Sequence, residues 1–247
     1  MRSCVLGIVF LAACGGAQSG KAPDSLRAGT GNGEPGTVAK GGATVPSSAA
    51  PVPAGRKTVL IVGTSLTAGL GLEPDDAYPA ILQRKADSLG LHVDIVNAGL
   101  SGETSAGALR RIDWLLRGPA DVVVIETGAN DGLRGLNVDS TRANLRAIIG
   151  KVKAARPAAR ILLAQMEAPP NLGAKYTTAF RAMYQDVAKE EDVGIMPFLL
   201  EGVAGVTRLN QGDGIHPNEE GELIVAANVW AALEPVLRQL DAPVTTS

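Results

Sequence analysis

The chain has 247 residues, of which 45% are hydrophobic, so it can bury a substantial core in one or two domains. Its 23 Lys and Arg residues nearly balance its 25 Asp and Glu residues, which excludes a nucleic-acid binder that depends on phosphate contacts. Aromatic residues make up 3% of the chain and leave little for stacking on bases or sugar rings. Two histidines and two cysteines are too few for an ordinary zinc site, and we expect no metal or other cofactor.

Residues 1–13 have the features of a bacterial lipoprotein signal peptide. Arg2 gives a positive start, and the apolar run 5–13 is too short to cross a membrane. The sequence LAAC at 11–14, followed by two glycines, resembles a lipobox and implies cleavage before Cys14 and acylation of that residue. Several acyl chains give stable anchoring. We therefore expect an exported lipoprotein, anchored to a membrane and facing the periplasm or the cell surface; an ordinary secretory signal is the alternative.

Residues 14–56 consist mainly of Gly, Ala, Ser, Pro and Thr, without periodic large apolar residues. Such a composition predicts a flexible tether, because it buries too little surface to offset the entropy of ordering. Gly31, Gly33 and Gly36 spell G-x-G-x-x-G. A dinucleotide-binding loop needs a strand before this motif and a helix after it. Neither is predicted here, so we assign the motif no function.

Short β-branched runs alternate with helical segments after the tether. Strands are predicted at five places, namely 58–63, 92–97, 121–126, 160–165 and 194–198. Helices are predicted at 78–89, 105–116, 140–155 and 176–190, with a last helix after Pro217, which suits a first-turn position. This alternation favours an α/β fold with helices on both faces of a five-stranded, mostly parallel sheet. We expect one domain over residues 57–240 and a C-terminal tail over 241–247.

Polar residues gather where the predicted strands end. Ligands of doubly wound sheets bind at the carboxyl ends of the strands. Those ends read GTSL at 63–66, NAGLSG at 97–102 and GAND at 128–131, and the loop before the last helix reads DGIHP at 213–217. A serine, an asparagine and an Asp/His pair are therefore expected along one edge of the sheet.

A serine nucleophile needs a base, and histidine is the usual one near neutral pH. His92 opens a predicted strand and should lie at the opposite end of the sheet, which leaves His216 as the candidate. Asp213 lies three residues earlier and can bond to Nδ1 of His216, so that Nε2 faces a serine. Taken alone, Ser65 also suits a helix N-cap, and Asp213 could cap the last helix. The motif G-x-S-x-G is absent because Thr67 replaces its second glycine, which argues against an α/β-hydrolase.

Four blocks in order resemble the SGNH, or GDSL, hydrolases, and within them the bacterial arylesterase, lysophospholipase and thioesterase branch. They are GTSLTAGLGL (63–72), NAGLSGETSAG (97–107), ETGANDGLRGL (126–136) and DGIHPNEEG (213–221), and the shorter APPNLG (168–173) and PFLLEGVAG (197–205) also match. The resemblance implies a flavodoxin-like three-layer α/β/α domain and a serine esterase that forms an acyl-enzyme. It also implies a catalytic triad of Ser65, Asp213 and His216. The implied oxyanion hole consists of the backbone N–H groups of Ser65 and Gly102 and the side-chain amide of Asn130.

Thr64 stands where the family motif usually has an aspartate. That aspartate is not the triad acid, so we expect a changed loop stability or rate rather than inactivity. By resemblance, residues 167–175 form a loop beside the acyl pocket. The expected substrate is a small-molecule acyl ester, with lysophospholipids as one candidate class. The alternatives are a carbohydrate O-acetylesterase of the cell envelope and a non-catalytic envelope lipoprotein with the same fold.

Overall fold

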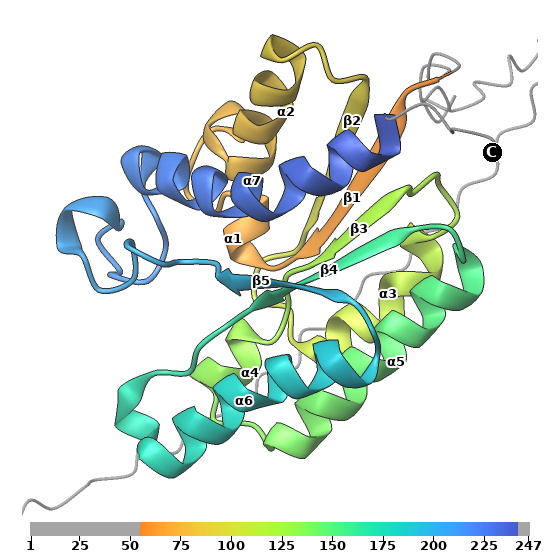
Figure 1. The fold of residues 1–247 in the computed structure, drawn as a ribbon. Helices are drawn as coiled ribbons and strands as arrows, with labels where there is room; N and C mark the ends of the chain where they lie inside the picture. Colours follow the sequence, from red (N-terminus) through yellow and green to blue (C-terminus); the bar gives the residue numbers. More distant parts are fainter. Residues whose placement is uncertain (1–54, 242–247) are drawn as a thin grey trace, which may run out of the picture. The chain divides into compact units, whose positions relative to one another are not determined.

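The computed structural model describes residues 55–241, and its centre is a parallel β-sheet (Figure 1). The strands are β1 (Lys57–Gly63), β2 (Val93–Gly99), β3 (Val122–Ile125), β4 (Arg160–Gln165) and β5 (Gly194–Phe198). Their order across the sheet is β2-β1-β3-β4-β5, and every pair of neighbours is parallel. This is the flavodoxin-like order. The expected fold class is confirmed.

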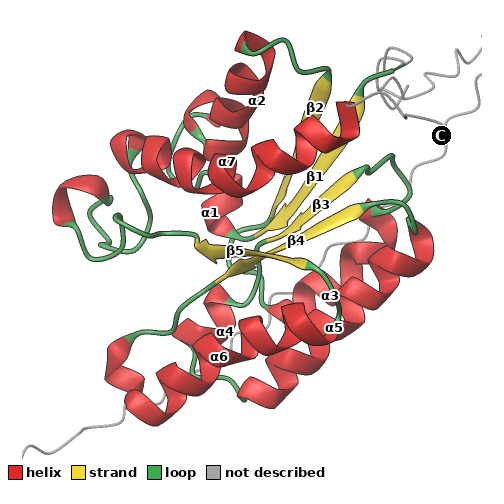
Figure 2. Cartoon of the chain, in the orientation of Figure 1, coloured by secondary structure: helices red, strands yellow, loops and turns green. Residues whose placement is uncertain are grey.

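Helices cover both faces of this sheet (Figures 1 and 2). One face carries α2 (Tyr78–Ser88) and α7 (Glu219–Asp241), which pack against each other. The other carries α3 (Ser105–Leu115), α5 (Val138–Ala155) and α6 (Ala174–Glu190), with α5 in contact with both of the others. Two short helices, α1 (Ser65–Ala68) and α4 (Ala129–Leu133), follow β1 and β3 directly. Single 3-10 turns lie at Pro74–Asp76, Pro170–Leu172 and Thr207–Leu209.

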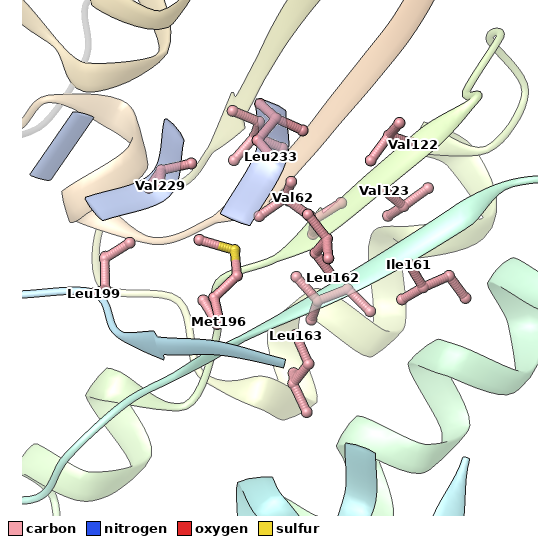
Figure 3. Packing of buried hydrophobic residues seen from close by; sticks show 14 of the residues in the cluster. Val62, Val122, Val123, Ile161, Leu162, Leu163, Met196, Leu199, Val229 and Leu233 are labelled. Atoms are coloured by element: carbon pink, nitrogen blue, oxygen red, sulfur yellow. The ribbon is translucent and has the colours of Figure 1, made fainter. Parts of the chain in front are cut away.

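The core lies between the central strands and the helices. Val59, Ile61 and Val62 of β1 are fully buried, as is the whole of β3. Burial on both faces is why these strands read as continuous apolar runs rather than as alternating patterns. Figure 3 shows Val229 and Leu233 of α7 in the same cluster as the strand side chains.

By length and composition alone, α7 could cross a membrane. However, Val225, Val229, Leu233 and Leu237 recur at helical spacing and are at most 2% exposed in the core. A helix that covers one face of a sheet needs such an apolar stripe. We therefore describe α7 as a core helix.

The predicted elements agree with the observed ones within a few residues. The fourth and fifth strands have the predicted bounds, whereas β2 runs on to Gly99 because its pairing with β1 continues to Gly63. The prediction that Pro217 occupies the first turn of the last helix is wrong. Pro217 forms an isolated bridge with Asn210, and α7 begins only at Glu219. Asn218 precedes the helix, and its side chain accepts the N–H of Gly221.

Several expected features lie outside the described residues: the signal peptide at 1–13, Cys14, most of the tether at 14–56 and residues 242–247 of the tail. Within the described part, β1 begins at Lys57 and α7 ends at Asp241.

The strand order reverses between β1 and β3, and their carboxyl ends therefore form the edge where ligands bind in such folds. The segments that leave this edge are α1 after β1, the turn at 100–103 after β2, and α4 after β3.

Candidate active site

Ser65 is the first residue of α1, directly after the tight turn at Thr64 that follows β1, and it is 7% exposed. The chain folds back so closely that a Cβ on Gly63 would lie 1.9 Å from Oγ1 of Thr67. Only glycine permits this approach. The turn consequently carries Ser65 at the strand end, where its side chain lines a cavity.

His216 brings its imidazole to Ser65 from a loop 151 residues further along the chain. Its Nε2 lies 2.9 Å from Oγ of Ser65, and its Nδ1 lies 2.6 Å from Oδ2 of Asp213. With the proton on Nδ1 donated to Asp213, Nε2 is free to accept the hydroxyl proton of Ser65.

Asp213 is held in place by its own loop. Its Oδ1 accepts the backbone N–H groups of Ile215 and His216, each at 3.0 Å. The hydrogen bond from the His216 side chain, together with these two, lowers the pKa of Asp213 to about 2. The carboxylate is thus ionised and can stabilise an imidazolium on His216. The sequence left open whether Asp213 caps the last helix, and in the structure it does not cap α7.

Gly102 and Asn130 line the same cavity as Ser65 and His216. Gly102 has a φ of +76°, which favours glycine, and its carbonyl accepts a hydrogen bond from Arg134 at 3.0 Å. The Asn130 amide donates one hydrogen bond to the Glu103 carbonyl at 3.0 Å and has a second N–H to offer to a ligand. The structure therefore brings together all five residues that the sequence proposed for the triad and the oxyanion hole.

Two buried carboxylates hold the loops around these residues, and sequence reasoning missed both. Glu103 pairs with Arg111 at 2.6 Å, and Arg111 also donates to the carbonyls of Gly63 and Ala98. Asp131 accepts the backbone N–H and the hydroxyl of Ser105, which joins the start of α3 to α4. The only signal in the sequence was the position of these acids inside the motif blocks at 97–107 and 126–136.

Glu126 was also missed, although it directly follows the apolar run of β3. It is fully buried behind the Ser65 turn and accepts the Thr64 N–H at 2.8 Å and the Thr64 hydroxyl at 3.0 Å. Burial raises the pKa of Glu126 to about 7, although these hydrogen bonds act in the opposite direction. An acidic residue at the end of a fully apolar strand was the available signal.

The cavity beside Ser65 has a volume of about 450 Å³, within the usual range for small-molecule sites. Most of its lining is apolar and comes from five segments; it includes Leu66, Leu70, Leu133, Met166, Pro169, Phe198, Leu200 and Ile215. Glu167 to Pro170 also line it, where the resemblance implied a loop beside an acyl pocket. This lining can receive an apolar chain.

His92 lies at the opposite end of the sheet, as the sequence predicted; it directly precedes β2 instead of opening it, and it is exposed. Among residues 55–241, no group of three or more His, Cys, Asp or Glu side chains could hold a metal ion.

The model of the GDSL-like lipase/acylhydrolase family matches residues 61–224. The chain belongs to this family. It is 42% identical over 186 residues to esterase TesA of Pseudomonas aeruginosa, which covers 74% of this chain and 91% of the relative. It is 40% identical over 181 residues to thioesterase 1/protease 1/lysophospholipase L1 of Escherichia coli, and the alignment covers 73% of this chain and 85% of the relative.

Solved structures of family members have the same fold. A crystal structure of TesA superposes with a TM-score of 0.70 at 41% identity and covers 73% of this chain and 99% of that one. A structure of esterase EstA of Pseudoalteromonas, inhibited by monoethylphosphonate, superposes with a TM-score of 0.70 at 35% identity. It covers 74% of this chain and 99% of EstA. The chain is thus a carboxylic ester hydrolase of the SGNH type with a small-molecule ester substrate. The relatives favour neither the O-acetylesterase nor the non-catalytic alternative.

Proposed function

We propose that Ser65 is the nucleophile, His216 the general base and Asp213 the residue that orients the base. Ser65 Oγ attacks the carbonyl carbon of an acyl ester while Nε2 of His216 takes the hydroxyl proton. The carbonyl oxygen becomes an oxyanion that accepts hydrogen bonds from the N–H groups of Ser65 and Gly102 and from the Asn130 amide.

Collapse of this intermediate breaks the bond to the leaving alcohol, which departs with the proton from His216. An acyl group remains on Ser65 Oγ. Water then attacks the acyl-enzyme while His216 takes its proton; the bond between the acyl carbon and Ser65 Oγ breaks, Ser65 regains its proton from His216, and the carboxylic acid is released. The observation that carries this proposal is the line of two hydrogen bonds from Asp213 through His216 to Ser65, ending at a cavity.

We further propose that the acyl group is a chain of four or more carbons, with lysophospholipids as a candidate natural substrate. The apolar lining of the cavity supports a fatty acyl chain over an acetyl group, because burying each CH₂ contributes about 0.8 kcal/mol. The name of the E. coli relative includes lysophospholipase, which supports the same substrate class.

The test is hydrolysis of p-nitrophenyl esters of two to twelve carbons by the full-length chain. We expect kcat/KM to rise from the acetyl ester and to peak at four carbons or longer. Hydrolysis of the acetyl ester alone would contradict the acyl-chain proposal and favour an O-acetylesterase.

We also propose that the chain is an exported lipoprotein, anchored through Cys14, with residues 14–56 as the tether and residues 57–240 as the catalytic domain. In a bacterial host fed labelled fatty acid, the wild-type chain is expected to incorporate the label and Cys14→Ala to lose it. Cys4→Ala is the matched control, since Cys4 lies within the expected signal peptide, and it should retain the label. Label in the Cys14 variant would disprove the anchor.

A further inference from the structure

A buried group of side chains lies directly behind the Ser65 turn. It consists of Glu126, Thr64, Thr67 and Tyr78, which are at most 1% exposed, and we call it the Glu126 cluster. The Glu126 carboxylate accepts hydrogen bonds from the Thr64 N–H at 2.8 Å, from the Thr64 hydroxyl at 3.0 and 3.2 Å to its two oxygens, and from the Thr67 hydroxyl at 2.8 Å. Two of these donors belong to the residue that precedes Ser65.

The hydrogen-bond pattern of the cluster fits an ionised Glu126. The Tyr78 hydroxyl lies 2.6 Å from Oγ1 of Thr67. If the Tyr78 hydroxyl donates to Thr67 and the Thr67 hydroxyl donates to Glu126, each hydroxyl proton in this series of hydrogen bonds has an acceptor. A neutral Glu126 must itself donate to one of these hydroxyls, so a donor loses its acceptor. Protonation of Glu126 therefore weakens the contacts that hold the turn.

The other titratable groups around the cluster are acids, phenols and one engaged cation. Glu222 of α7 accepts the Tyr78 N–H at 2.8 Å; burial, and after it the nearby Glu126 carboxylate, raise the pKa of Glu222 to about 8, although this hydrogen bond acts in the opposite direction. Tyr184 of α6 lies on the face of the sheet that α3, α5 and α6 cover, and it is also fully buried. Arg111 of α3 reaches the Gly63 carbonyl but pairs with Glu103. Among residues 55–241, no lysine or arginine donates a hydrogen bond to Glu126, so the hydroxyls and the Thr64 N–H stabilise its charge.

We propose that Thr64 and Glu126 are positioning residues for ester hydrolysis. The ionised Glu126 carboxylate holds the backbone and the hydroxyl of Thr64, and this contact fixes the next peptide unit, whose N–H belongs to Ser65. The direction of that N–H towards the oxyanion, and of the Ser65 hydroxyl towards His216, then depends on the charge of Glu126. This inference rests on the proposed role of Ser65.

The threonine in place of the family aspartate has a chemical meaning in this arrangement. A threonine hydroxyl donates to Glu126, whereas an ionised aspartate at position 64 could only accept and would repel the buried carboxylate. Thr64 therefore favours the charged state of Glu126 that the turn requires.

The experiment compares Thr64→Val, which removes the hydroxyl but keeps the shape, with Thr64→Ser, which keeps the hydroxyl. The pKa of Glu126 is followed by ¹³C NMR of the labelled glutamate carboxyls, assigned by their change in Glu126→Gln. In parallel, kcat for a four-carbon ester is measured between pH 5 and 9. Loss of one hydrogen bond to the carboxylate is expected to raise the pKa of Glu126 by about one to two units in Thr64→Val.

In the wild-type chain, the acid-side fall of kcat should include a step at the pH where Glu126 titrates. In Thr64→Val, this step should move to higher pH together with the NMR titration of Glu126. In Thr64→Ser, both should return to the wild-type pH, and in Glu126→Gln the step should disappear. KM should change less than twofold in all three variants. A uniform loss of kcat at every pH, with no shift in the profile, would indicate a merely structural role and overturn the inference. So would a wild-type titration of Glu126 that matches no step in kcat.

Failure of the proposed function gives a different result. The wild-type chain would then show no ester hydrolysis above the level of Ser65→Ala, whereas the NMR titration would still report whether the Thr64 hydroxyl lowers the pKa of Glu126. An unchanged Glu126 pKa in Thr64→Val would overturn the inference even in an inactive chain.

Discussion

Ser65→Ala is expected to lower kcat for a four-carbon p-nitrophenyl ester by about 10⁴-fold or more. The substitution removes the atom that forms the acyl-enzyme, and His216 cannot replace it because its Nε2 then faces a methyl group. Residual turnover would come from the oxyanion donors, which remain in place. The measurement is steady-state hydrolysis, together with mass spectrometry of the chain after treatment with a fluorophosphonate, which should modify the wild-type chain at Ser65 only.

Ser88→Ala is the matched control for this prediction. Ser88 lies at the exposed end of α2, where its hydroxyl donates only to the Lys85 carbonyl, so its loss should leave both turnover and labelling unchanged. If Ser65→Ala hydrolysed the ester at the wild-type rate while remaining folded, the assignment of the nucleophile would be wrong.

Asn130→Ala is expected to lower kcat by about 10²–10³-fold with little change in KM, since an oxyanion donor acts mainly in the transition state. The alanine also removes the hydrogen bond to the Glu103 carbonyl, so part of the loss could arise from movement of the turn at 100–103. The far-ultraviolet circular dichroism and the melting temperature of the variant are measured alongside its kinetics.

Asn130→Asp is a second test of the oxyanion role; it also loses the hydrogen bond to the Glu103 carbonyl, so its circular dichroism and melting temperature again report movement of the turn at 100–103. An aspartate has nearly the same shape, but its carboxylate cannot donate and adds a negative charge where the oxyanion forms. We expect it to be at least as slow as Asn130→Ala. Turnover near the wild-type level in either variant would remove Asn130 from the oxyanion hole.

The fold could be predicted from the sequence because local and global signals agree. The strands β1 and β3 are apolar on both faces, and the helices between strands carry an apolar stripe, so each element shows its burial in its own residues. The short helices α1 and α4 were not predicted. They are four and five residues long, too short for a periodic pattern, and depend on the turns around them.

The candidate site was predicted in part. Ser65, His216 and Asp213 could be named because histidines are scarce and because the strand ends of a parallel sheet meet at one edge. Glu126 and Arg111 could not be named, because their roles depend on which backbone groups come within reach after folding. The carbonyls that Arg111 contacts belong to Gly63 and Ala98, on two different strands. The spacing of these residues along the chain does not predict the contacts.

The separation of 151 positions between Ser65 and His216 also bears on when the proposed triad is complete during synthesis of the chain. A nascent chain that has reached residue 212 contains the nucleophile and all three proposed oxyanion donors, but it has neither Asp213 nor His216. It also lacks α7, whose Val229 and Leu233 belong to the core. If Asp213 and His216 act as proposed, we expect a ribosome-bound chain to be inert towards esters, with hydrolysis beginning only after the final helix has been made and has packed against the sheet.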